Sequence, residues 1–304
     1  MDELTEESVW LEYYDAFSYF TPDAVRPLCH PKKWLHSGGS DKSIVLVHGL
    51  TDCPYSMQAI ALHFYQELGY DVYLPLLQCH GLKDANGMRG VRLSAWKDNV
   101  HFAVEAAAQG GRTVSIGGLS TGGALAFSFA ASHSKVEGEL YLFSAAFGLY
   151  GGIGNLLTPL LEGFLKLPFI PLLTSGSSLV VDNPYRYRRV PFISARELVY
   201  LMDENKLLLQ AIKDGKAFDT RVFSAWSEGD RVVRIDLLAE FESILKVGHF
   251  TPYIIPEKAC VVHACVVLAE QVFACDSGPG DSPIELANPH FFLMLDSLDR
   301  FEAS

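Results

Sequence analysis

Residues 118–122, Gly-Leu-Ser-Thr-Gly, have the spacing of a serine nucleophile held in a tight turn. Glycines on both sides of a serine allow a sharp strand-to-helix turn that projects the hydroxyl above a sheet. Gly117 and Gly123 extend the run of small residues. A serine hydroxyl does not ionise unaided near neutrality, so the chemistry also needs a base and a group that orients it. We predict acyl transfer with Ser120 as nucleophile; the alternative is a glycine turn with an inert serine.

The candidate acid and base follow Ser120 in the chain. Asp230 comes shortly after the apolar run 221–226, at the carboxyl end of a predicted strand, where open α/β sheets place their sites. Glu228 is the second choice, and a plain turn aspartate is the alternative. The chain order serine, acid, histidine favours His290 as the base, because it lies after the last predicted strand and before a C-terminal helix.

Four other histidines are weighed against His290. His249 follows a glycine and is the second choice, but it precedes a strand predicted at 260–268. His263 lies inside that apolar run and is interpreted as a core histidine. His133 ends a predicted helix, where a cation complements the helix dipole. His48 is early in the chain and is expected to be structural.

The loop after the first buried strand supplies a candidate oxyanion site. Residues 48–51, His-Gly-Leu-Thr, directly follow the apolar run 43–47. We predict that the backbone N–H of Leu50 and that of Thr121, at the positive end of a helix, bind the oxyanion. In this scheme His290 takes the serine proton, Asp230 orients the imidazole, and no metal or cofactor is required. Activity should then fall as the pH drops through roughly 6 to 7, where histidine titrates.

The elements that must hold these residues alternate between strand and helix. Strands are predicted at 43–47, 70–74, 112–117, 139–143, 221–226 and 260–268, and helices at 58–68, 94–108, 122–132, 235–245 and 293–301. This alternation predicts an α/β protein with a mostly parallel sheet flanked by helices. Residues 1–147 and 219–304 form the predicted core. The apolar segment 148–218, with a helix at 195–202, is predicted to be an inserted cap, or alternatively another core layer.

Composition and charge limit the classes of partner and the cellular compartment that we expect. The 304 residues carry a formal net charge of −12, which disfavours nucleic-acid binding. The acidic start lacks the pattern of a secretory signal, and no apolar stretch is long and uninterrupted enough for a membrane span, so we expect a cytoplasmic protein without integral membrane association. The six cysteines show no paired short spacing and are expected to be free thiols. Cys260 and Cys265 would point to opposite faces of a strand, so no metal site is predicted.

At this point the chain resembles the α/β-hydrolase superfamily, and within it bacterial carboxylesterases and monoacylglycerol-lipase-like enzymes. Four segments carry the resemblance, and two of them match the family closely: the oxyanion segment 48–54 and the acid turn 229–233. Residues 76–81 are similar to a Gly-His-Gly stretch, with Cys79 in place of the first glycine. Residues 96–100 are similar to Trp-x-x-Asp-Val, with Asn99 in place of aspartate. The likeness covers about 43–146 and resumes near 221. It implies an α/β-hydrolase fold with a cap. The wide separation of Asp230 and His290 implies an insertion around the last strand.

The predicted reaction is hydrolysis of carboxylic esters through an acyl-enzyme, on small acyl or aromatic esters such as monoacylglycerols. Apolar side chains of the cap region favour a hydrocarbon substrate; they are Phe164, Leu167, Phe169 and Leu172. Thioesterase, amidase, peptidase, carbon-carbon hydrolase and cofactor-free peroxidase chemistry use similar triads and remain alternatives. A different class of alternative is a hydrolase-fold protein that binds a small apolar ligand without catalysis.

Overall fold

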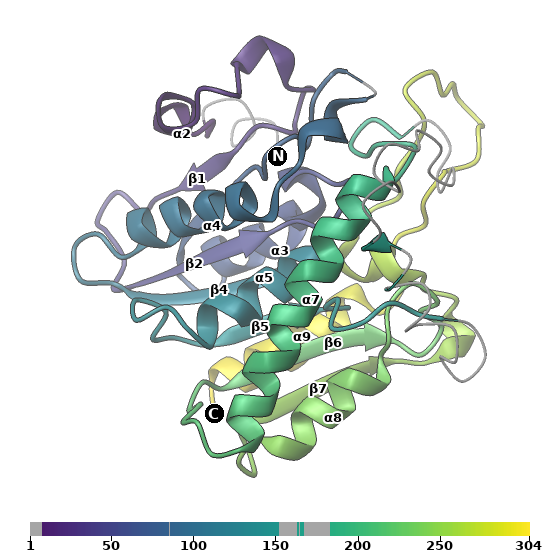
Figure 1. The fold of residues 1–304 in the computed structure, drawn as a ribbon. Helices are drawn as coiled ribbons and strands as arrows, with labels where there is room; N and C mark the ends of the chain where they lie inside the picture. The colour runs from purple at the N-terminus through teal and green to yellow at the C-terminus, as the bar shows by residue number, and fades with distance from the viewer. Residues whose placement is uncertain (1–7, 85, 152–162, 164, 167–182) are drawn as a thin grey trace.

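A twisted, mostly parallel sheet forms the centre of the molecule (Figure 1). The computed structural model describes residues 8–84, 86–151, 163, 165–166 and 183–304. In these residues the seven-stranded sheet has the order β1-β3-β2-β4-β5-β6-β7. The strands are β1 (Lys32–Trp34), β2 (Lys42–Val47), β3 (Asp71–Leu74), β4 (Thr113–Leu119), β5 (Leu140–Phe143), β6 (Val222–Ser227) and β7 (Phe250–Ile255). Only β1 pairs antiparallel, with β3, so the predicted fold class is confirmed.

Helices cover both faces of the sheet. They are α2 (Leu11–Ala16), α3 (Gln58–Gln66), α4 (Leu93–Ala107), α5 (Thr121–Ala130), α7 (Phe192–Lys213), α8 (Asp236–Ile244) and α9 (Phe291–Glu302). Alternate residues of β2 enter two different apolar clusters: Val45 and Val47 pack with α4 and α5, whereas Ile44 and Leu46 pack with α3 and α9. A strand buried on both faces is therefore apolar throughout, as the sequence indicated. No described helix combines the length and apolar character needed to cross a bilayer.

The predicted last strand is wrong. Residues 260–268 are not a strand; they contain the short 3-10 helix η7 (His263–Val267). The seventh strand is β7, ten residues earlier, and its burial is mixed because it lies at the edge of the sheet. The apolar run at 260–268 instead packs over the α9 side as part of the second apolar cluster. Periodicity could not separate these two outcomes, because a short apolar run fits both a buried strand and a buried turn.

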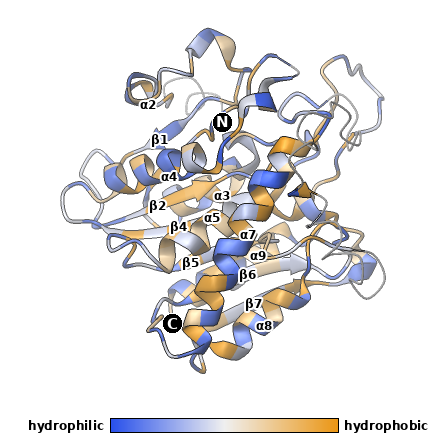
Figure 2. Cartoon of the chain, in the orientation of Figure 1, coloured by the Kyte–Doolittle hydropathy of each residue, from blue (hydrophilic) through white to orange (hydrophobic). Residues whose placement is uncertain are grey.

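The predicted helix at 195–202 belongs to the longer helix α7. This helix packs against α5, and its Leu201 and Met202 enter the same apolar cluster as α5. The Asn205 side-chain amide also donates to the carbonyl of Ala124, at 2.8 Å. Figure 2 shows α7 as bands of hydrophobic and hydrophilic colour, in keeping with one buried and one exposed side. Most of the rest of the proposed cap, including its four named apolar residues, lies outside the described residues.

A disulfide joins Cys29 and Cys53, which corrects the expectation of free thiols throughout. The two cysteines are 24 residues apart in sequence, but the fold brings their Cα atoms to 5.1 Å. The expectation rested on the absence of close sequence spacing, which says nothing about pairs formed by long-range folding. The described cysteines that remain free are Cys79, Cys260, Cys265 and Cys275.

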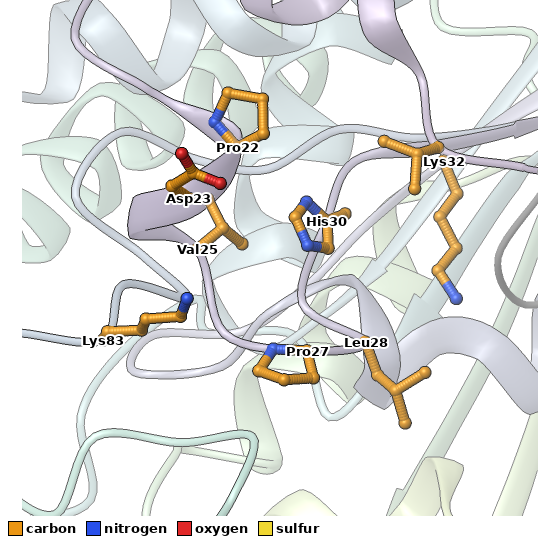
Figure 3. Close-up of a pocket in the computed structure, with 9 residues that line it drawn as sticks. Pro22, Asp23, Val25, Pro27, Leu28, His30, Lys32 and Lys83 are labelled. Carbon is orange, nitrogen blue, oxygen red and sulfur yellow. The ribbon is translucent and has the colours of Figure 1, made fainter.

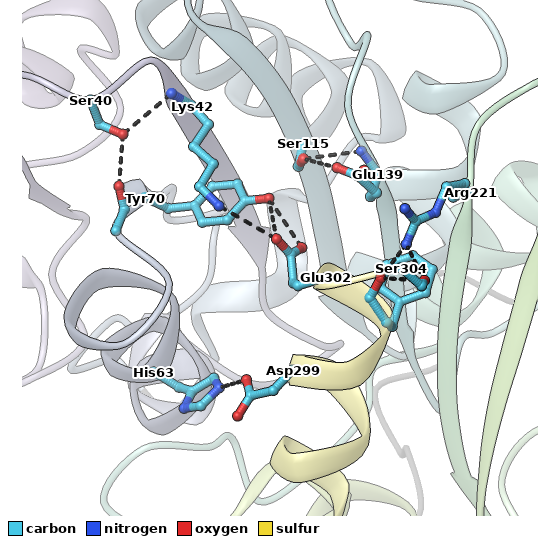
Figure 4. A network of polar contacts seen from close by, with 12 residues as sticks. Ser40, Lys42, His63, Tyr70, Ser115, Glu139, Arg221, Asp299, Glu302 and Ser304 are labelled. Atoms are coloured by element: carbon cyan, nitrogen blue, oxygen red, sulfur yellow. Dashed lines mark hydrogen bonds and ion pairs between the residues drawn. The ribbon is translucent and has the colours of Figure 1, made fainter.

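The C-terminal helix α9 is attached to the sheet by a polar network around Glu302 (Figure 4). The hydroxyls of Tyr70 and Tyr141 both donate to this carboxylate, the first at 3.0 Å. The ammonium of Lys42 lies 3.5 Å from it. Both tyrosines are buried, and Glu302 supplies a charged acceptor to each of their hydroxyls.

Removing the Glu302 carboxylate should destabilise the fold strongly. Glu302→Ala removes the charged acceptor of two buried phenols, at about 1 to 3 kcal/mol each, so we expect a loss of about 2 to 4 kcal/mol in the free energy of unfolding. Urea unfolding measures it. Glu12→Ala is the control, because Glu12 is exposed and pairs with Lys33 on the surface, and an exposed pair contributes about 0 to 1 kcal/mol. Equal losses in both variants would contradict the network's role.

Candidate active site

Ser120 stands at a strained turn between β4 and α5. Strand β4 ends at Leu119 and the helix begins at Thr121. The serine has φ 54° and ψ −113°, a conformation that a residue other than glycine adopts only when its surroundings impose it. Its N–H donates to the carbonyl of Phe143 at 2.9 Å, which fixes the turn to the neighbouring strand β5. This is the strand-turn-helix context in which the Gly-x-Ser-x-Gly pattern presents a nucleophile.

The flanking glycines are required by close backbone approach. A Cβ at Gly118 would lie 2.5 Å from the carbonyl oxygen of Val47, and one at Gly122 would overlap the same carbonyl. A Cβ at Gly123 would come within 2.7 Å of Ala145. The start of α5 therefore sits directly against the end of β2, which only residues without a side chain permit. This explains the glycine pattern in physical terms.

The loop after β2 runs beside Ser120. A Cβ built on Gly49 would be 3.5 Å from the Cβ of the serine. His48, which begins this loop, is fully buried: its Nε2 accepts from the N–H of Leu77 at 3.1 Å and its Nδ1 lies 2.9 Å from the carbonyl of Gly49. Burial, and then the nearby His80, hold the pKa of His48 well below its ordinary value. A neutral histidine with both ring nitrogens bonded agrees with the structural role predicted for it.

Asp230 and His263 form a buried acid-base pair. The Oδ2 atom of Asp230 lies 2.6 Å from Nδ1 of His263, and Oδ1 accepts from the N–H groups of Val232 and Val233 at 2.8 and 3.2 Å. Because an ionised carboxylate can only accept, Nδ1 must carry the proton and Nε2 is left as the basic nitrogen. Among the described residues, that Nε2 has no hydrogen-bond partner. The pair thus has the arrangement of an oriented general base.

The surroundings of Asp230 keep it ionised. Burial alone would raise its pKa, but the hydrogen bond and charge of His263 outweigh burial. The N–H groups of Val232 and Val233 act in the same direction, and together these contacts hold the pKa below its ordinary value of 3.8. An ionised Asp230 stabilises the imidazolium that forms when His263 takes a proton.

The structure does not pair His290 with Asp230, contrary to our prediction. His290 is the residue that precedes α9; its Nδ1 lies 3.3 Å from the hydroxyl of Tyr253, and its N–H donates to Asn288. The error follows from the mistaken strand, because a histidine inside a buried strand would be a core residue. His263 instead begins η7, in the chain segment that follows β7.

Neither second choice takes part in an acid-base pair with the residues predicted for it. The carbonyl of His249 accepts from the N–H of Val222, the first residue of β6, so His249 is at the amino edge of the sheet. Asp230 follows the carboxyl end of the same strand. The side chain of Glu228 accepts from the N–H of Glu257 at 3.1 Å and not from a histidine.

The serine, the acid and the histidine therefore share one edge of the sheet. Ser120 follows β4, Asp230 follows β6 and His263 comes after β7, and these strands are parallel and close together in the order β4-β5-β6-β7. Asp52 connects the loop beside Ser120 with His263, since its Oδ2 lies 2.9 Å from the Cβ position of Gly49 and its charge interacts with His263. In open α/β sheets the carboxyl edge is where sites are built.

The pH dependence of the free energy of unfolding should reflect the lowered pKa of Asp230. A carboxyl whose pKa is lower in the folded state than in the unfolded state stabilises the fold above its unfolded pKa, and this contribution disappears as the pH falls through the folded pKa. We expect wild type and Asp230→Asn to differ by a constant free energy of unfolding above about pH 5, and this difference to shrink as the pH falls below about 4 through the folded pKa. Urea unfolding across this range measures it, with the exposed Asp98→Asn as control. A difference that stayed constant at the lowest pH would contradict the interpretation.

Two other features lie outside this edge site. A cavity of about 360 Å³ is lined by the N-terminal segment and Lys83, with Lys32 and Lys83 on opposite sides (Figure 3). Burial lowers the pKa of Lys32 to about 8, and its ammonium donates to Gln58 at 3.0 Å. The cavity contains none of Ser120, Asp230 and His263.

One group of metal-type ligands occurs in the part of the chain that the structure describes. It comprises His101, Glu105 and His133, whose ligand atoms lie within 4.8 Å of one another. Lys135 forms an ion pair with Glu105, and its N–H is 3.3 Å from Nδ1 of His133. A lysine ammonium already neutralises the carboxylate, and the cluster shares no residue with the edge site.

Comparison with known proteins identifies the family and the fold of the chain. The family model described as serine aminopeptidase, S33, matches residues 38–252. A thermostable monoacylglycerol lipase from Bacillus sp. (strain H-257) is 30% identical over 177 residues, which are 56% of this chain and 65% of that protein. The match thus spans just under two thirds of the relative.

Two solved structures share the fold at low identity. One comes from work on LipS and LipT, two metagenome-derived lipolytic enzymes; it is 19% identical, with a TM-score of 0.66, and covers 92% of this chain and 100% of its own. The other is a soluble variant of monoglyceride lipase from Saccharomyces cerevisiae in complex with a substrate analogue, 12% identical, with a TM-score of 0.65, covering 90% of this chain and 91% of its own. With the family match over more than half of its length, the chain belongs to the serine aminopeptidase S33 family of α/β-hydrolases.

Proposed function

We propose that this protein is a serine hydrolase that cleaves small carboxylic esters through an acyl-enzyme. Ser120 is the nucleophile, His263 the general base and Asp230 the residue that orients it. The observation that carries the proposal is the 2.6 Å contact between Asp230 and Nδ1 of His263, with Nε2 unpaired among the described residues and the strained Ser120 at the same edge of the sheet. The proposal keeps Ser120 and Asp230 from the sequence and replaces His290 with His263.

The reaction proceeds in two balanced steps. The Oγ atom of Ser120 attacks the ester carbonyl while Nε2 of His263 takes the hydroxyl proton, and the N–H groups of Leu50 and Thr121 bind the oxyanion. The intermediate collapses, the C–O bond to the alcohol breaks, and His263 returns the proton to the leaving alcohol. Water then attacks the acyl-enzyme with His263 again as base, and the free acid leaves Ser120 regenerated. The first N–H groups of a helix have no partner within it, which suits Thr121 for this task.

The relatives support esters of lipid type as substrates. The monoacylglycerol lipase from Bacillus and the monoglyceride lipase from yeast are lipolytic by name, and both are similar to this chain. We propose monoacylglycerol-like or aromatic esters as the substrate class, and residues 148–218 as the cap except for α7, which packs on α5. The reaction needs neither a cofactor nor a nucleic acid. Thioester and amide hydrolysis use the same residues and are the competing reactions.

Hydrolysis of p-nitrophenyl esters of short and long acids, and of a monoacylglycerol, tests the proposal. We expect turnover by the wild type and a loss of about 10⁴-fold or more in kcat for Ser120→Ala, because no other group forms the acyl bond. Ser144→Ala is the matched control, since Ser144 also has a positive φ, 44°, and directly follows the neighbouring strand β5. Full activity of folded Ser120→Ala would overturn the mechanism. A wild type that binds ester analogues but turns over no acyl substrate would favour the binding-protein alternative.

A further inference from the structure

A buried arginine connects the loop beside Ser120 with the segment that carries His263. The Nε atom of Arg186 forms an ion pair with Asp52. One terminal nitrogen bonds to Oε1 of Glu285 at 2.8 Å, and the other lies 3.5 Å from the carbonyl oxygen of Ala264. The guanidinium is thus shared among three partners from distant parts of the chain, and only 7% of the side chain is exposed.

Two of the three partners, Asp52 and Ala264, lie within two residues of a residue of the proposed mechanism. Asp52 is two residues after Leu50, and its N–H donates to the carbonyl of Gly49 at 3.2 Å, which closes the oxyanion loop into a turn. Ala264 directly follows His263. Arg186 therefore spans the two backbone segments whose separation sets the distance between the oxyanion donor and the base.

The neighbours of these residues make the connection stiff. The N–H of Tyr187 donates to the carbonyl of Thr51 at 3.0 Å, so the arginine segment is attached to the oxyanion loop a second time. Glu285 is bonded through its backbone to Val272, which ties its loop to the chain after His263. The backbone segments on both sides of the guanidinium are thus held in place by hydrogen bonds of their own.

The charges in this group favour a fixed arrangement. Burial opposes the charge of Arg186, but Asp52 and Glu285 outweigh it and raise the arginine pKa, so the guanidinium stays protonated. Burial raises the pKa of Asp52 to about 6 although Arg186 lowers it. Buried ion pairs add little net stability, because desolvation offsets their attraction. A planar fork of donors does, however, impose a geometry that a lysine ammonium cannot reproduce.

We propose that Arg186 is a positioning residue for the reaction: it sets the placement of the oxyanion loop relative to His263 by bonding Asp52, Glu285 and the carbonyl of Ala264 at once. The residue acts through these partners and touches neither substrate nor Ser120. The inference rests on the proposed function. We call the three contacts of Arg186 the clamp. Displacing a catalytic group by about 1 Å can lower a rate by about 10²-fold, so loss of the clamp should lower kcat more than it changes substrate binding.

The test compares Arg186→Lys and Arg186→Met with Arg112→Met. Arg112 is a matched control because it also pairs with a buried aspartate, Asp71, at 3.1 Å, but at the amino ends of β3 and β4. We expect both Arg186 variants to lower kcat for a p-nitrophenyl ester by about 10- to 100-fold, with KM changed by less than about threefold. Arg112→Met should lower the free energy of unfolding and leave kcat within about twofold of the wild type.

Three further readouts decide between positioning and plain stability. The rate of covalent inactivation by a serine-directed phosphonate should fall in the Arg186 variants by the same factor as kcat. Asp52→Asn should lower kcat as Arg186→Met does, and the double variant should be no worse than the single ones, since both break one clamp. If Arg186→Met does not fold, the same measurements are made on Arg186→Lys and Glu285→Gln, which change the fold less.

Folded Arg186→Lys with kcat within about twofold of the wild type would overturn the inference. A kcat loss in Arg112→Met as large as in Arg186→Met would also overturn it, because general destabilisation would then explain both. Phosphonate labelling of the wild type separates this failure from that of the proposed function. An unlabelled Ser120 refutes the function, whereas a labelled Ser120 with unchanged rates in the Arg186 variants refutes the clamp alone.

Discussion

Replacing His263 by alanine should lower kcat/KM by about 10⁴-fold or more without unfolding the protein. Among the described residues, His263 is the one histidine bonded to Asp230, and its second nitrogen is unpaired. Without it the serine proton has no acceptor, and the residual rate comes from oxyanion binding alone. Steady-state hydrolysis of a p-nitrophenyl ester, with circular dichroism to check folding, measures the effect.

His290→Ala is the matched control for this experiment. His290 contacts the hydroxyl of Tyr253 and is not bonded to Asp230, so its loss should change kcat/KM by less than about fivefold. His249→Ala should behave in the same way, because His249 is at the amino edge of the sheet. A folded but inactive His290→Ala beside an active His263→Ala would restore the histidine that the sequence favoured and refute the pair seen in the structure.

Asp230→Asn should lower kcat by about 10⁴-fold while preserving the shape of the side chain. The carboxylate accepts from Nδ1 of His263, whereas an amide nitrogen at that position would donate and turn the imidazole to the wrong tautomer. The nitrogen left outside this contact would then carry the proton and could not act as a base. Kinetics across about pH 5 to 9 would show the loss at every pH, since the defect is one of orientation.

Glu228→Gln serves as the control for the acid. Glu228 lies two residues earlier in the same turn, but its carboxylate accepts only from the N–H of Glu257 among its described contacts. We expect kcat within about threefold of the wild type. An inactive Glu228→Gln with an active Asp230→Asn would show that the other carboxylate of this turn is the catalytic acid.

Local patterns were sufficient to predict the strand-turn-helix at Ser120 and the turn that carries Asp230. The pattern around Ser120 encodes a backbone constraint, since Gly118 and Gly122 meet the carbonyl of Val47 whatever the rest of the fold does. The position of Asp230 could be predicted because this residue comes shortly after the apolar run that forms β6. Both depend on a few consecutive residues, and so both could be predicted from the sequence.

The base depends on long-range structure and could not be predicted in the same way. The segment around His263 has a composition that suits a strand, and only the placement of β7 before it shows that it is a turn. One signal was present: Asp230 and His263 are 33 residues apart, whereas the separation from His290 is wide. The Cys29–Cys53 disulfide and the contacts of Arg186 also join distant segments, and neither leaves a pattern in the sequence.

The central claim is that Ser120 is a nucleophile activated by His263, and the rate and site of phosphonate labelling test it most directly. Intact-mass and peptide analysis should find a single adduct on Ser120 in the wild type and in Ser144→Ala. No adduct should form in Ser120→Ala, and labelling of His263→Ala should be slower by about 10³-fold or more. An adduct on another residue, or equal labelling rates for the wild type and His263→Ala, would contradict the account.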